Sequence, residues 1–164
     1  MHPEELKNLI QKYRRHGLLV DSNLLLLYFI GSCNRDLISK FKRTIEYTLQ
    51  DYDYLQWLIG SFQVIYTTPN ILTEVSNLSK SIGKNIRSGY YEEFARRLAV
   101  MKEEYVESAG VCGDDALWRI GLTDAVIAKL APERCLAITV DVDLYTLLQD
   151  RRIDVINFNH IRPF

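Results

Sequence analysis

Acidic residues stand at or just beyond apolar segments at four places in this 164-residue chain. Asp21 ends "GLLVD", Glu74 lies in "TPNILTEVSNL", Asp124 lies in "GLTDAVIAKLA", and Asp141 and Asp143 lie in "ITVDVDLY". Carboxylate oxygens are the ligands that Mg²⁺ and Mn²⁺ prefer in proteins. Carboxylates that gather without a cation repel each other and raise each other's pKa. If these segments meet in space, the sequence therefore predicts a divalent metal site.

Each acid has an ordinary structural interpretation when it is taken alone. Asp21 is of a type that often terminates strands, and Asp124 is a first-turn acid that a helix dipole favours. Glu74 falls at the edge of the apolar face of its helix, where a solvated rim residue is common. Either Asp141 or Asp143 suits the cap of the following helix. The metal-site prediction thus depends on the four segments converging.

Strand and helix patterns alternate along the chain and predict an α/β fold with a parallel sheet. Strands are expected at "GLLVD", "FQVIYTT", "RCLAITV" and "IDVINF". Apart from the helices that carry or follow the acids, helices are expected over about residues 3–15, 34–49, 51–60 and 86–108. Sites in an open parallel sheet form beyond the carboxyl ends of the strands. Asp21 and Asp141 are expected at such ends.

The order of these acidic motifs resembles the PIN domain, a metal-dependent nuclease family that includes bacterial toxin ribonucleases and RNA-processing factors. The resemblance runs over residues 1–164 as a single domain, and "LTDAVIAKLA" and "TVDVDLYTLL" carry it most specifically. It implies a three-layer fold with a central parallel sheet of four or five strands between helices. Relative to compact family toxins, about residues 32–62 are expected to form a helical insertion.

The resemblance also implies an activity and a set of site residues. Asp21, Glu74, Asp124 and Asp141 match the family's catalytic acidic quartet, which binds Mg²⁺ or Mn²⁺, and Asp143 matches a further acid near the metal. The implied reaction is hydrolysis of an RNA phosphodiester bond by an endoribonuclease, with one or two metal ions and with 5′-phosphate and 3′-hydroxyl products.

Supporting residues follow from the same resemblance. Ser22 or Asn23 falls where a polar residue helps to hold the first aspartate, and Thr139 falls where a small hydroxyl residue hydrogen-bonds within the site. The adjacent acids Asp114 and Asp115 depart from the family pattern, and we interpret them as a solvated turn or a helix start.

RNA contact is expected, if anywhere, at "KSIGKNIRSGYY", which holds Lys80, Lys84 and Arg87. Basic side chains neutralise phosphates and nearby tyrosines stack on bases, although a solvated basic loop has the same composition. Family toxins bind an antitoxin protein and often dimerise, so an antitoxin and a homodimer are possible partners. The aromatic segment at about 45–62 suits such an interface or the core.

Composition limits the remaining classes of protein. The net charge of −1 excludes a general electrostatic binder of nucleic acid. The three cysteines have no zinc-site or disulfide spacing, and a reducing, cytoplasmic setting is expected. The longest apolar run, at residues 24–31, is too short to span a bilayer, so no membrane partner is expected.

Two other functions stay open. "DVD" in "AITVDVD" matches the DxD motif with which glycosyltransferases hold a nucleotide-sugar through Mn²⁺, but this interpretation leaves Asp21, Glu74 and Asp124 unexplained. The chain is alternatively a non-catalytic PIN-like module that binds RNA or protein. Failure to bind Mn²⁺ would favour the module, and tight binding of a nucleotide-sugar would favour the transferase.

Overall fold

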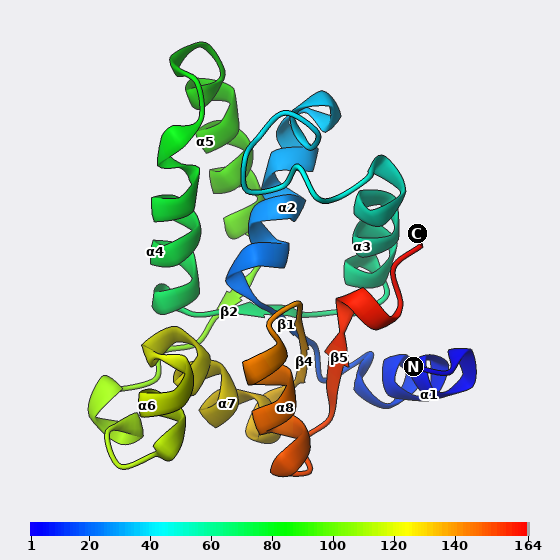
Figure 1. Cartoon of the computed structure of the whole chain (residues 1–164), viewed down its shortest axis with the longest axis vertical. Coiled ribbons are helices and arrows are strands. Elements are labelled where there is room, and N and C mark those ends of the chain that lie inside the picture. Colours follow the sequence, from blue (N-terminus) through cyan, green and yellow to red (C-terminus); the bar gives the residue numbers. More distant parts are fainter. Residues whose placement is uncertain (164) are drawn as a thin grey trace.

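A five-stranded, all-parallel sheet lies between helices in the computed structural model, which describes residues 1–163 (Figure 1). The strand order is β3-β2-β1-β4-β5. In chain order the strands are β1 Leu18–Val20, β2 Ile65–Thr67, β3 Lys102–Glu103, β4 Leu136–Thr139 and β5 Val155–Asn157. This arrangement confirms the expected α/β class with a central parallel sheet of four or five strands between two layers of helices.

The helices divide between the two faces of the sheet (Figure 1). They are α1 Pro3–Tyr13, α2 Ser22–Cys33, α3 Leu49–Gly60, α4 Pro69–Leu78, α5 Lys84–Leu98, α6 Asp115–Ile120, α7 Leu122–Arg134 and α8 Val142–Asp150. Helices α2, α3, α4 and α5 lie on one side in Figure 1, and α6, α7 and α8 lie on the other. No helix within residues 1–163 has the length and apolar character that crossing a membrane requires.

Strand β1, in the middle of the sheet, is buried along its whole length. Leu18, Leu19 and Val20 of β1 are fully buried, as expected for a parallel strand that helices cover on both faces. In the pairing of β1 with β4, Val20 lies opposite Ile138. The next residues along the two strands are Asp21 and Thr139, so this register brings the carboxyl ends of β1 and β4 to the same point on the sheet edge.

The helix predicted over about residues 34–49 is wrong. This segment contains only the short 3-10 helix η1 (Arg35–Leu37) and turns, and α3 begins after a capping box formed by Thr48 and Asp51. The hydroxyl of Thr44, a fully buried residue, donates to the carbonyl oxygens of Ile38 at 2.9 Å and Phe41 at 3.3 Å. Such side-chain bonds compete with the helical backbone pattern. Within the expected helical insertion at 32–62, residues 34–48 are therefore not α-helical, whereas α3 occupies the second half.

The long helix predicted over about 86–108 is also wrong at its end. Helix α5 stops at Leu98, and the chain then forms β3, which pairs with β2. Both residues of β3 are exposed at the edge of the sheet. Because this strand is two residues long and polar, it has no apolar periodicity from which to predict it.

Helix α6 precedes the Asp124 helix, and an ion pair fixes its start. Asp114 accepts a hydrogen bond from the backbone N–H of Ala116 as the N-cap of α6. Arg151 of the α8 end donates to the carboxylates of Asp114 and Asp115, so these acids are a paired helix start. Gly121, with φ of 85°, then turns α6 into α7 through a conformation that favours glycine.

Most aromatic residues at about 45–62 belong to the core. Tyr47, Tyr52 and Phe62 are buried, whereas Trp57 is 52% exposed and stacks on Tyr54 with ring centroids 5.2 Å apart. The core-packing interpretation thus holds for the buried three, and Trp57 is available at the surface.

Candidate functional site

Asp21 is the most firmly held acid of the candidate site. It follows β1, caps the N-terminus of α2 and is 4% exposed. Its Oδ1 accepts from the N–H of Leu24 at 2.8 Å, and its Oδ2 accepts from the Thr139 hydroxyl at 2.5 Å and from the N–H of Val140 at 2.9 Å. Burial raises the pKa of Asp21, and these three hydrogen bonds oppose the rise. The carboxylate therefore has a fixed position and orientation.

Thr139 connects Asp21 to Asp141. The Thr139 hydroxyl donates to Asp21 and accepts from the backbone N–H of Asp141 at 2.8 Å. Asp141 caps α8, since its Oδ1 accepts from the N–H groups of Asp143 and Leu144 at 2.8 and 2.9 Å. Both of these capping bonds go to Oδ1. Asp141 thus combines the expected helix cap with a position next to Asp21.

Glu74 reaches the same edge from α4. The N-cap Thr68 and Pro69 start this helix directly after β2, as the sequence indicates. The Ser22 hydroxyl donates to Glu74 Oε2 at 2.9 Å, and Ser22 is itself buried. Ser22 therefore holds Glu74, whereas Asp21 is held by Thr139 and by backbone N–H groups. Asn23 is exposed.

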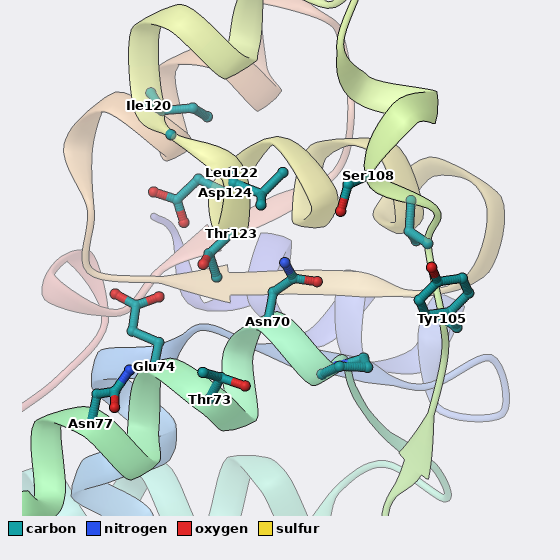
Figure 2. Close-up of a pocket in the computed structure, with 13 residues that line it drawn as sticks. Asn70, Thr73, Glu74, Asn77, Tyr105, Ser108, Ile120, Leu122, Thr123 and Asp124 are labelled. Carbon is teal, nitrogen blue, oxygen red and sulfur yellow. The ribbon is translucent and has the colours of Figure 1, made fainter.

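Asp124 faces these acids from the first turn of α7. Figure 2 shows the Asp124 and Glu74 carboxylates pointing toward one another from α7 and α4. Burial, and after it repulsion from the carboxylates of Asp141, Asp21 and Glu74, raises the pKa of Asp124 to about 7. Every one of these causes acts in the same direction, and none is a positive charge or a hydrogen bond. Four carboxylates from separate segments therefore share one electrostatic environment.

The remaining predicted residues lie outside this cluster. Asp143 is exposed in the first turn of α8, and it is not among the charges that raise the pKa of Asp124. Lys80, Lys84 and Arg87 lie at the α4–α5 turn, at the end of α4 that points away from the sheet (Figure 1). There the Arg87 guanidinium donates to the carbonyl oxygen of Lys80 at 2.9 Å. The structure thus separates the predicted basic segment from the acids.

The acids fit a hard cation in their chemistry, although their side chains do not form a closed cage. Asp21, Glu74, Asp124 and Asp141 offer oxygen ligands alone, the set that Mg²⁺ and Mn²⁺ prefer. Within residues 1–163, no group of three or more His, Cys, Asp or Glu side chains is arranged so that it could hold a metal ion as it stands. Metal binding would therefore require these side chains to move inward.

A groove of about 600 Å³ opens beside Glu74 and Asp124 (Figure 2). It lies between α4, the α6–α7 turn and the segment that follows β3. Among its lining residues, six uncharged polar or aromatic side chains were not foreseen from the sequence: Asn70, Thr73, Asn77, Tyr105, Ser108 and Thr123. Asn70, Thr73 and Asn77 recur at helical spacing on the side of α4 away from the buried Ile71 and Val75. This polar stripe in the sequence could have predicted that α4 lines a polar groove.

No known family model matches the chain, and no curated protein has significant sequence similarity to it. The resemblance to the PIN domain therefore rests on the four acidic motifs and on their order.

Proposed function

We propose that this protein is a metal-dependent endoribonuclease that hydrolyses RNA phosphodiester bonds. The observation that carries the proposal is the meeting of Asp21, Glu74, Asp124 and Asp141 at the carboxyl edge of a parallel sheet. Ligand sites in such sheets form at this edge. Buried carboxylates without a positive partner are costly, so their presence together needs a compensating cation. The acidic motifs that resemble those of the PIN domain give the same assignment.

The four acids would bind Mg²⁺ or Mn²⁺ with different degrees of rigidity. Asp21 is immobilised by three hydrogen bonds and gives the site a fixed reference point. Asp141 is anchored through its Oδ1, and Glu74 is oriented through its Oε2 by Ser22. Asp124 is the acid that is held least. A bound ion would supply charge neutralisation at the phosphate and a water of lowered pKa.

A nuclease accounts for the site better than a DxD glycosyltransferase does, because a nuclease would use all four buried or half-buried acids. In the transferase interpretation Asp141 and Asp143 act together, yet Asp143 is exposed and Asp21 and Glu74 have no task. A non-catalytic module would bind RNA or protein without needing the acids. The repulsion between the four carboxylates would then destabilise the protein without contributing to its function.

The resemblance extends the proposal to partners. RNA is the proposed substrate, and an antitoxin protein or a second copy of the chain is a proposed partner. Trp57 is the exposed aromatic residue of the 45–62 segment and is where such a contact would be tested first. Light scattering of wild type and Trp57→Ala would compare their masses. A second copy held at Trp57 predicts a lower mass for the variant.

The test is cleavage of a panel of single-stranded RNAs with Mn²⁺, with EDTA, and with Asp124→Asn in place of wild type. The matched control is Glu133→Gln, which removes one exposed charge from the other end of α7. We expect wild type and the control to cleave in Mn²⁺, and wild type in EDTA and Asp124→Asn to be inactive. Cleavage by Asp124→Asn at the wild-type rate would remove Asp124 from the site. Wild type that binds no Mn²⁺ by calorimetry would support the non-catalytic module.

A further inference from the structure

The groove beside the acids has one wall made by a polar face of α4. Asn70 and Asn77 are seven residues apart, which is about 10 Å along a helix, and Glu74 lies between them. Asn70 and Glu74 are half-buried, and Asn77 is exposed. One wall of the groove thus presents a carboxylate of the candidate site flanked by two amides.

Tyr105 stands at the end of the groove away from Asp124 (Figure 2). It follows β3 and is 77% exposed, and Asn70 lies between it and Glu74 in Figure 2. A large aromatic side chain left this open at the mouth of a groove has a face available for stacking. Strand β3 ends two residues before Tyr105 and so positions this side chain at the groove, near the N-terminal end of α4.

The charge of the groove argues against binding by phosphate contacts. Its charged lining residues are Glu74 and Asp124, and no Lys or Arg lines it within the described residues. An RNA backbone bound along this surface would meet no cationic side chain. Amide and hydroxyl groups beside an aromatic ring instead match a nucleobase, which offers donors and acceptors on its edges and a face for stacking.

We infer that this groove binds one unpaired nucleobase of the substrate, next to the phosphodiester that is cut. The base stacks on Tyr105, and the amide of Asn70, which lies between Tyr105 and Glu74, hydrogen-bonds to its edge. The substrate class is therefore single-stranded RNA, because a paired base in an A-form duplex shows neither its face nor its Watson–Crick edge to such a groove. The volume of about 600 Å³ lies within the range of small-ligand pockets. This inference rests on the proposed function.

The experiment separates base binding from cleavage. Binding of fluorescein-labelled RNA ten-mers rich in A, C or U is measured by anisotropy in Mn²⁺, using the Asp124→Asn background to prevent cutting. Tyr105→Ala should weaken binding about 5- to 100-fold, the effect of losing one stacked base. Tyr105→Phe keeps the ring and should stay within about twofold of its parent. Asn70→Ala should reduce the preference among the three RNAs. A paired duplex of the same length should not compete.

The matched control is Trp118→Ala, which removes an aromatic side chain that is 85% exposed and lies outside the groove. Binding by Tyr105→Ala that equals binding by Trp118→Ala would overturn the inference, and so would equal competition by the duplex or no RNA binding at all. Cleavage by otherwise wild-type protein is measured separately. Loss of binding in Tyr105→Ala alongside inactive wild type would reject the nuclease proposal while supporting the base site.

Discussion

Replacing Asp124 by Asn should stabilise the metal-free protein while it abolishes cleavage. Asp124 has a pKa of about 7 in the folded protein against an ordinary value of 3.8. Since one pKa unit corresponds to about 1.4 kcal/mol, the ionised carboxylate destabilises the folded state by up to about 4 kcal/mol. The asparagine amide removes the charge but stays a desolvated polar group, which costs about 1–3 kcal/mol. We therefore expect a net gain of about 1–3 kcal/mol at about pH 8, where Asp124 of wild type is ionised.

The pH dependence identifies the cause of this gain. Between about pH 4 and pH 7 the folded wild type keeps the Asp124 proton that the unfolded chain has lost. The contribution of Asp124 to the free energy of unfolding of wild type therefore falls as the pH rises through this window, and it levels off above the folded pKa. The advantage of Asp124→Asn should be up to about 3 kcal/mol larger at about pH 8 than at about pH 5.

The assay is urea unfolding in EDTA at both pH values, followed by tryptophan fluorescence. A gain of about 2 kcal/mol would also raise the melting temperature by about 4–8 °C in a chain of this size. Glu133→Gln is the control, and its exposed site should change stability by no more than about 0.5 kcal/mol at either pH. An Asp124→Asn protein that is less stable than wild type at about pH 8, or a change in stability that is equal at both pH values, would refute the reasoning that repulsion and burial destabilise the Asp124 carboxylate.

Three further predictions concern the bonds around the cluster. Mn²⁺ should raise the wild-type melting temperature more at about pH 8 than at about pH 5 in differential scanning fluorimetry, because protonated Asp124 is a poor ligand, and an equal shift would contradict its ligand role. Thr139→Val should lower the free energy of unfolding by about 1–3 kcal/mol in urea titrations, because Asp21 loses the hydroxyl that donates to it, whereas Thr139→Ser should stay close to wild type. Ser22→Ala should weaken Mn²⁺ binding about 10-fold by calorimetry, because Glu74 loses the group that orients it, and unchanged affinity would show that Glu74 lies outside the metal site.

The parts of the fold that were predictable share strong apolar patterns. The strand "LLV" of β1 and the strand "LAIT" of β4 are buried throughout, and continuous apolar runs reveal such strands. Parallel pairing then carries Asp21 to the position beside Thr139 without further information. The segment at 34–49 was mispredicted because a buried side-chain hydrogen bond of Thr44 replaces helical bonding there, and such a bond has no periodic pattern in the sequence. Strand β3 was missed because its two residues are exposed and polar.

The contacts within the site were harder to predict because they join distant segments. Ser22 was expected to support Asp21, its neighbour in sequence, but its hydroxyl donates to Glu74, which is 52 residues away. The direction of one small side chain at the start of α2 depends on how α4 packs against it. The order of the motifs contains no information about that packing. Residue types were thus predictable, whereas the pairing between them was not.

Asp124 shows why a local conflict in a sequence is informative. The residues one helical turn further along α7, Ile127 and Ala128, are buried and apolar, and an uncharged residue of similar size would be accommodated beside them at lower cost. The fold instead places the Asp124 carboxylate near those of Asp21, Glu74 and Asp141, which lie at the starts of α2 and α8 and within α4. Residues that lower the stability of a fold are commonly kept because they bind a ligand or take part in catalysis. The cost of Asp124 therefore supports the metal site more strongly than the number of acids does, because surface acids are common, whereas a half-buried acid among like charges carries a cost that a bound cation would remove.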